Sequence, residues 1–144
     1  MTRVFLDSDV ILDFLLGRKP FALSAGMIFA HAERGELQLC TSTVSFLNVH
    51  SIAATQTNKG EAATLIRQLR TLVSLLPVTV QAVDVALGTE GHDLEDQVQF
   101  NCAQENQIDF LVTRNIKDYP KKGLPVMPPD VFLDTVPQLS SGND

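Results

Sequence analysis

Hydrophobic and polar positions along the chain predict short buried strands separated by amphipathic helices. Short apolar runs bounded by polar or turn residues are typical of strands that are buried on both faces. Strands that alternate with helices favour a parallel sheet covered by helices on both sides. We therefore predict an α/β fold, a three-layer α/β/α sandwich around a central parallel sheet of about four to five strands. The predicted strands are Arg3–Leu6, Leu37–Thr41, Val78–Val80, Phe110–Val112 and Leu124–Met127.

The helices are predicted from apolar positions that recur every three or four residues. One of them follows a cap at Ser42 or Thr43, has apolar positions at Val44, Leu47 and Ile52, and ends before a polar loop at 55–60. We expect a single domain over residues 1–139 and a flexible tail at 140–144. The other predicted helices are Val10–Leu16, Phe21–Arg34, Glu61–Leu75, Gln81–Leu87, Asp93–Gln107 and Pro128–Val136.

The stretch DLEDQVQFNCAQENQIDFLVTRNIKDY, residues 93–119, has the strongest functional signal. Leu94, Val98 and Cys102 recur at four-residue spacing, which predicts a helix with one buried stripe. Asp93 then becomes the N-cap of this helix. The apolar run that follows predicts a strand, and polar residues come directly after it.

Three acids that are distant in the sequence are predicted to meet at one edge of the sheet. Asp7 follows the first strand, Asp96 lies in the first turn of a helix, and Asp118 follows the fourth strand. Functional groups in open parallel sheets collect beyond the carboxyl ends of the strands. Because Mg²⁺ and Mn²⁺ prefer hard oxygen ligands, these acids predict a divalent-metal site. Alternatively, Asp93 and Asp96 only cap their helix, and Asp7 and Asp118 only form turns.

Length, composition and net charge limit the classes of protein to which this chain can belong. A chain of 144 residues with 44% hydrophobic residues is about one domain long. The formal net charge of −6 argues against binding of nucleic acid through a broad basic patch, but carboxylates that hold a metal remain compatible with a nuclease. No apolar run approaches the ~20 residues of a membrane span, and acids interrupt residues 1–16, so we expect a cytoplasmic protein without membrane association.

Other candidate chemistry is weaker. His31, His50 and His92 lack the spacing of zinc ligands. Ser8 and Thr113 have no histidine in a supporting position, so we interpret them as polar groups that orient carboxylates rather than as nucleophiles.

Two segments resemble the PIN-domain ribonucleases, a family that includes the toxins of many bacterial toxin–antitoxin pairs. These segments are FLDSDVILDFLLGR, near the start, and residues 93–119, and the resemblance extends from Arg3 to about Leu133. It implies an α/β/α sandwich and an endoribonuclease that depends on Mg²⁺ or Mn²⁺. By this resemblance Asp7, Asp96 and Asp118 match the family's metal-binding acids, and Asp93 is an accessory position. It also implies an antitoxin partner and self-association.

One position departs from the family pattern. Members usually have a glutamate in the helix after the second strand, and the best match here is Asn48, in TVSFLNVHS. An amide can donate an oxygen to a metal but carries no negative charge, so metal affinity and activity should fall.

Three hypotheses follow. The first is hydrolysis of single-stranded RNA by a toxin, with Arg114 contacting a substrate phosphate. The second is a degenerate PIN domain that binds RNA or a protein partner without cleaving it. The third, a receiver or phosphatase-like domain that also gathers acids at strand ends, lacks the expected lysine at a strand end. In the first hypothesis the accessory residues are Asp93, Asp9, Asn48, Ser8, Thr113 and Asn115.

Overall fold

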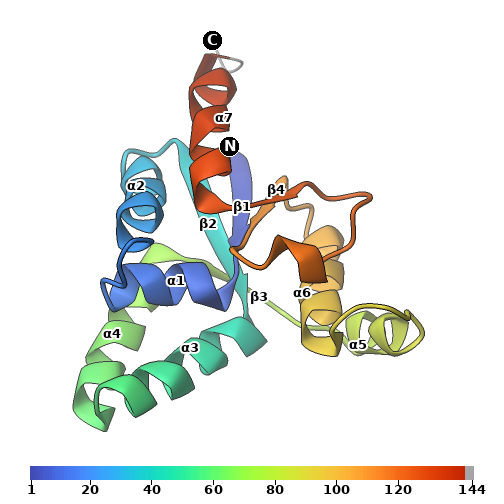
Figure 1. Ribbon diagram of the computed structural model, residues 1–144, viewed down its shortest axis with the longest axis horizontal. Helices are drawn as coiled ribbons and strands as arrows, with labels where there is room; N and C mark the ends of the chain where they lie inside the picture. Colours follow the sequence, from blue (N-terminus) through green and yellow to red (C-terminus); the bar gives the residue numbers. More distant parts are fainter. Residues whose placement is uncertain (142–144) are drawn as a thin grey trace.

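A parallel five-stranded sheet organises residues 1–141, the part of the chain that the computed structural model describes (Figure 1). The strand order is β3-β2-β1-β4-β5, and every neighbouring pair is parallel. This confirms the predicted α/β class. The elements are β1 Thr2–Leu6, α1 Ser8–Leu15, α2 Ala22–Glu33, β2 Leu37–Ser42, α3 Thr43–Gln56, α4 Lys59–Leu72, β3 Ser74–Leu76, α5 Val80–Leu87, α6 Leu94–Glu105, β4 Phe110–Val112, the 3₁₀ turn η1 Ile116–Asp118, β5 Val126–Met127 and α7 Pro129–Ser141.

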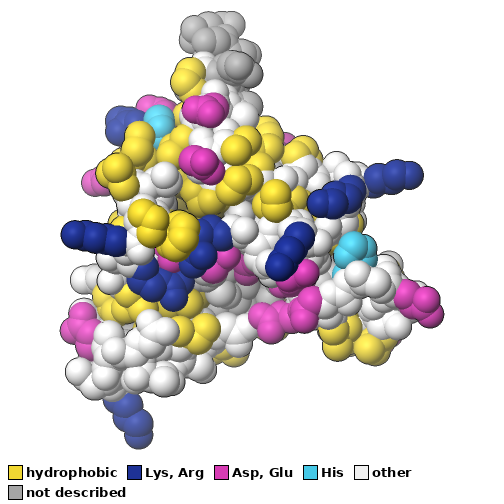
Figure 2. All heavy atoms as spheres, in the orientation of Figure 1, with side chains coloured by type: hydrophobic (Ala, Val, Ile, Leu, Met, Phe, Trp, Pro, Cys, Tyr) yellow, Lys and Arg dark blue, Asp and Glu magenta, His cyan; other side chains and the backbone are white. Residues whose placement is uncertain are grey.

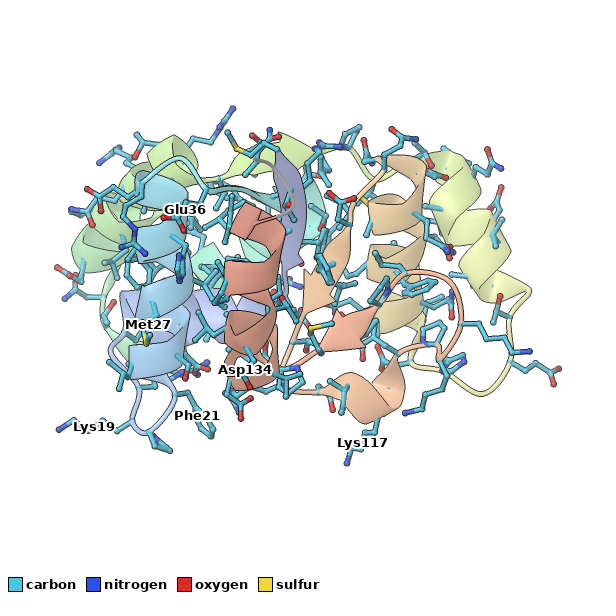
Figure 3. The ribbon with its side chains drawn as sticks, turned by 90° about the horizontal axis from the view of Figure 1, so that it is seen from above. Lys19, Phe21, Met27, Glu36, Lys117 and Asp134 are labelled. Carbon is cyan, nitrogen blue, oxygen red and sulfur yellow. The ribbon has the colours of Figure 1, made fainter. Side chains whose placement is uncertain are left out.

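The sheet separates two hydrophobic cores, because successive side chains of a strand point to opposite faces. In β1, Val4 and Leu6 belong to one core, which includes residues of α1, α2, α3, α4 and α7. Phe5 belongs to the other core, with Phe100 of α6 and Leu111 of β4. Viewed from above, α2 and α7 lie on one side of the sheet and α6 on the other, with α5 outside it (Figure 3). The three predicted layers are therefore present.

The third strand was placed wrongly in the sequence prediction. The expected strand Val78–Val80 is absent, and β3 is Ser74–Leu76, which pairs with β2 through Cys40↔Ser74. The preceding helix ends at Leu72 rather than Leu75, and the next residue has extended φ and ψ angles. An apolar run that continues helical spacing fits helix and strand equally well, and only pairing with β2 decides between them.

The buried faces of two helices also differ from the prediction. Leu47 and Ile52 are 63% and 37% exposed on α3, and Leu94 is 48% exposed on α6. Conversely, Gln97 and Asn101 of α6 are buried. The side-chain amide of Gln97 donates to Asn101 Oδ1 (2.9 Å), and Asn101 donates to the α5 carbonyl of Ala82 (3.0 Å). Because α6 lies between the sheet and α5, it buries polar residues as well as one apolar stripe.

The remaining differences lie at the ends of elements, and the last strand begins at Val126 rather than at Leu124. Helix α3 continues to Gln56, into the predicted loop, and α4 begins at Lys59 with Asn58 as N-cap. Helix α7 runs to Ser141, so the expected tail at 140–144 begins inside a helix, and its last three residues lie outside the described part of the chain. Among the helices of residues 1–141, none combines the length and hydrophobicity that a membrane span requires.

Candidate active site

The site lies where the strand order changes direction, at the carboxyl ends of β1 and β4. Strand β1 has β2 on one side and β4 on the other, which makes this edge the position at which open parallel sheets bind ligands. Leu6 pairs with Val112, so Asp7 and Thr113 leave adjacent strands side by side. In the space-filling view, acidic side chains gather across the centre of one face near the start of α6, beside basic side chains near α1 (Figure 2).

Asp7 is held at this edge by three donors. It is the N-cap of α1, and its Oδ1 accepts the backbone N–H of Ser8 (2.7 Å). Its Oδ2 accepts the hydroxyls of Thr113 (2.9 Å) and Tyr119 (2.8 Å). Hydrogen bonds from several donors fix the orientation of a carboxylate. The role predicted for Thr113, orientation of a carboxylate, agrees with this contact.

Asp9 is a second carboxylate at this edge, and it lies on the first turn of α1. Burial, followed by the negative charge of Asp7, raises its pKa to about 6. Its Oδ2 accepts the backbone N–H of Arg114 (3.0 Å). Within residues 1–141 the buried Oδ1 of Asp9 and Oγ of Ser8 have no hydrogen-bond partner. Buried polar atoms without partners cost free energy, so these oxygens are suited to a ligand.

Asp96 is the acid most strongly affected by its surroundings. It lies in the first turn of α6, where its backbone N–H donates to the predicted N-cap Asp93 (3.1 Å). Burial raises the pKa of Asp96 to about 7, and the charges of Asp7, Asp93, Asp118 and Glu95 add to this in that order. Since Asp7 and Asp118 both act on Asp96, the fold brings the three predicted acids into one electrostatic cluster.

Asp118 completes this cluster from the 3₁₀ turn η1. The side-chain amide of Asn115 donates to Asp118 Oδ2 (2.6 Å), and the backbone N–H of Asn115 donates to Thr113 Oγ1 (3.0 Å). The segment TRN-x-KD therefore folds into a turn whose polar side chains orient one another. Asn115 is placed as predicted, beside an acid of the site.

The oxygen atoms of the site are of the chemical type that Mg²⁺ and Mn²⁺ bind. Their positions do not form a complete coordination shell. Carboxylates, an amide and hydroxyls are the hard oxygen ligands that these ions prefer. In the part of the chain described here, no three Asp, Glu, His or Cys side chains converge closely enough to form a ready metal-ligand group. Burial and then repulsion by neighbouring acids raise the pKa of Asp96, and a bound cation would offset both effects on its carboxylate.

A buried ion-pair cluster borders the site, and the sequence analysis missed it. Asp13 is completely buried and accepts Arg18 Nε (2.8 Å), Arg114 Nε (2.7 Å) and Arg114 Nη2 (3.2 Å). The guanidinium of Arg114 also lies 3.9 Å from the ring centroid of Phe21, in the turn before α2 (Figure 3). An acid inside the apolar run 10–16 was the available signal, since a buried charge requires a partner. Arg114 is thus anchored by Asp13.

A hollow of about 730 Å³ opens over the carboxyl ends of the strands. Glu95, which the sequence analysis did not single out, lies on its wall, and Asn48 of α3 donates to Glu95 Oε1 (2.7 Å). Asp96 and Asp118 are not part of this wall. They are linked to Asp7 electrostatically, because the charges of Asp7 and Asp118 both contribute to the raised pKa of Asp96. A second hollow of about 710 Å³ has one acid in its lining, Glu33. The wall of the first hollow is formed by Asp7, Ser8, Asp9, Leu12, Arg18, Asn48, Ile52, Gln56, Glu95, Arg114 and Asn115.

Tyr119 was not predicted as a residue of the site. We expect it to support the site only through its hydroxyl group, which donates to Asp7. The side chain is completely buried, and burial together with the charges of Asp7 and Asp96 raises the pKa of its hydroxyl far above the usual range, so it remains a donor. We expect Tyr119→Phe to lower the free energy of unfolding by roughly 1.5–3 kcal/mol, the usual value of a hydrogen bond to a charged group. Urea unfolding measures this. A change below about 0.5 kcal/mol would contradict the assigned bond.

Comparison with known proteins gives one match by family and several by fold. The model of a family described as PIN domain matches residues 3–117. Among curated protein sequences there is no significant match. Three similar solved structures are described here, and each is under 25% identical to the chain.

The first is Mycobacterium tuberculosis VapC20, described as a toxin that cleaves the sarcin-ricin loop (14% identity, TM-score 0.62, 75% of this chain and 86% of that chain). The second is a toxin–antitoxin complex from Klebsiella pneumoniae (18%, 0.64, 88% and 97%). The third is the DNA-bound VapBC complex from Salmonella typhimurium (14%, 0.65, 90% and 99%). These structures share the fold of the chain.

Proposed function

This chain belongs to the PIN-domain family, and from that premise we propose that it is an endoribonuclease that hydrolyses phosphodiester bonds of single-stranded RNA with Mg²⁺ or Mn²⁺. The observation that carries the proposal is the electrostatic cluster of Asp7, Asp96 and Asp118 at the carboxyl ends of β1 and β4. Burial, followed by the charges of acids from distant parts of the chain, raises the pKa of the Asp96 carboxyl group there. A fold tolerates such repulsion at functional sites, where a ligand offsets it.

In this proposal Asp7, Asp96 and Asp118 hold the metal. When bound, the ion supplies a Lewis acid that offsets negative charge on the phosphodiester. Tyr119 and Thr113 keep Asp7 oriented through their hydroxyl donors, and further side chains keep the other acids in place. These accessory residues are Asn115 at Asp118, Asp93 at the start of α6, and Ser8 and Asp9 on α1.

Two arginines supply the positive charge that an RNA phosphate requires. Arg18 and Arg114 line the hollow, and their side chains are about one-third exposed. Each guanidinium has N–H groups that Asp13 does not use. We assign the predicted phosphate contact of Arg114 to these groups, and we add Arg18 as a second contact. This local pair explains how a chain of net charge −6 can bind RNA.

The biological setting is proposed from the similar structures. Two of the three are complexes of a toxin with its antitoxin. We propose that this chain is likewise the toxin of such a pair, that it acts in the cytoplasm, and that an antitoxin covers the hollow. Self-association is part of the same proposal, and α3, on which Leu47 is exposed and from which Ile52 lines the hollow, is a candidate contact for either partner.

The direct test is cleavage of RNA. Purified protein should cleave a single-stranded RNA in the presence of Mn²⁺ or Mg²⁺, and addition of a chelator should stop cleavage, because the proposed chemistry requires the cation. Gel analysis of a labelled RNA measures both results. Cleavage that continues at full rate after removal of divalent ions contradicts the assigned metal, and absence of cleavage with every divalent ion contradicts the enzyme.

A binding module is the second candidate, and Asn48 is the observation that favours it. The amide at this position leaves α3 without a carboxylate in the wall of the hollow. A degenerate PIN domain would then bind RNA or a protein partner without cleavage. RNA binding that is undiminished by chelator, together with absent cleavage, would favour this candidate.

A further inference from the structure

The contact between Asn48 and Glu95 joins two helices across the hollow, and it bears on how the acidic cluster is completed. Asn48 lies on α3, whereas Glu95 lies in the first turn of α6, directly before Asp96. The side-chain amide of Asn48 donates to Glu95 Oε1 at 2.7 Å, and both residues are part of the wall of the hollow, together with Asp7. The amide therefore holds a carboxylate in the place where α3 itself has none.

Glu95 is a carboxylate without a balancing cation. In the described part of the chain it forms no ion pair, and its Oε2 accepts no hydrogen bond. The negative charges of Asp7 and Asp93 both act on it. An acid that is fixed by a neutral donor, and that faces other acids, has an oxygen free for a cation.

The two residue types are complementary across this contact. A carboxamide N–H bonds well to a carboxylate, whereas two carboxylates at this separation would repel each other. Without a cation, a contact this short therefore favours one charged and one neutral side chain. In this chain the charge is on α6, and the neutral donor is on α3.

We propose that Glu95 supplies the fourth carboxylate of the metal site, and that Asn48 is the positioning residue that holds it. The inference rests on the proposed function, and it explains how the site is completed without an acid on α3. The acid is carried by α6 instead of by its hydrogen-bonded neighbour on α3. Asn48 is then part of an intact site rather than the mark of a degenerate one.

The first experiment measures Mn²⁺ affinity of the purified protein by calorimetry, without RNA. Glu95→Gln removes the charge and preserves the size of the side chain. We expect it to weaken Mn²⁺ binding by about tenfold or more, the scale known for residues around a metal. Glu61→Gln is the matched control, because Glu61, like Glu95, is an exposed residue in the first turn of a helix, here α4, and its substitution removes the same charge. The control should bind Mn²⁺ as the unchanged protein does.

The second experiment exchanges the two residue types. In the double variant Asn48→Glu with Glu95→Gln, the acid moves to α3 and the amide to α6, so the hydrogen bond can form in the opposite direction. We expect Mn²⁺ affinity to return to within about threefold of the unchanged protein. Asn48→Ala should weaken binding, and it should have little further effect when Glu95 is already replaced by Gln, since contacting residues are coupled.

The outcomes separate this inference from the proposed function. If Glu95→Gln binds Mn²⁺ like Glu61→Gln while Asp96→Asn loses binding, the inference is wrong and the metal site stands. A change in thermal stability of Glu95→Gln without a change in affinity means that the contact only ties α3 to α6, which also overturns the inference. If the unchanged protein does not bind Mn²⁺, both proposals fail.

Discussion

Asp96→Asn should abolish RNA cleavage and, at neutral pH, make the protein more stable. Cleavage should fall by more than about a hundredfold, since residues that only surround a metal already change activity by about 10–100-fold. Stability should rise because an amide does not ionise, whereas burial, followed by the charges of Asp7 and Asp93, disfavours the ionised carboxylate of Asp96. A residue that lowers stability and is needed for activity is characteristic of a functional site.

The pH dependence of stability follows from the upward shift of the Asp96 pKa. The pKa of Asp96 is about 7 in the folded protein and 3.8 in its unperturbed state, so the folded state binds this proton more tightly. The free energy of unfolding of the unchanged protein should therefore fall as the pH rises from about 4 to about 7. The amide that Asp96→Asn introduces does not titrate, so this loss should be smaller in the variant.

The measurements are RNA cleavage assays and thermal unfolding over this pH range. Asp130→Asn is the matched control, because Asp130 lies in the first turn of α7 and is absent from the acidic cluster. It should cleave RNA at the normal rate. If Asp96→Asn cleaves RNA at the rate of this control, Asp96 is not part of the site. If the stability of the unchanged protein, Asp96→Asn and Asp130→Asn depends on pH in the same way, the electrostatic cluster is contradicted.

Among the single substitutions proposed, Asp13→Asn should lower the free energy of unfolding the most. The buried carboxylate accepts three N–H groups of Arg18 and Arg114, and an amide in its place removes the charge and turns one acceptor into a donor. Breaking a buried ion pair costs about 3–5 kcal/mol. Because both arginines reach water, we expect the lower end of this range, about 3 kcal/mol in the free energy of unfolding.

Urea unfolding at neutral pH tests this expectation. Asp84→Asn on α5 is a suitable control, since Asp84 is exposed and its side chain has no ion pair in the described part of the chain. The control should change the free energy of unfolding by less than about 0.5 kcal/mol. If Asp13→Asn behaves in the same way, the cluster contributes little to stability and serves only to position the arginines.

Local patterns predicted the class of fold and the order of most elements, but not the position of the third strand. The caps at Ser42 and Asp93 were found because a cap depends on neighbours three residues away. Strand β3 was missed because its identity depends on pairing with β2. Local sequence carries no information about such a partner.

The same distinction applies to the site. That Asp7 and Asp118 lie near Asp96 could be predicted because each of the three follows a strand or begins a helix, and the fold brings strand ends together. Their role in a metal site stays a prediction. The contacts of Tyr119 with Asp7 and of Asn48 with Glu95 join residues far apart in the sequence, and nothing in either neighbourhood indicates them. Asp13 could have been found, since a charge within an apolar run requires a buried partner.

The order of the strands also determines when the candidate site can form during synthesis of the chain. Strand β1 leaves the ribosome first, yet β4, its central neighbour, follows about a hundred residues later, and the hydroxyl that orients Asp7 belongs to residue 119. A nascent chain therefore lacks its last acid and the turn that supports Asp7 until most of the polypeptide has emerged. If the proposed function holds, the site therefore forms only after most of the domain has been synthesised.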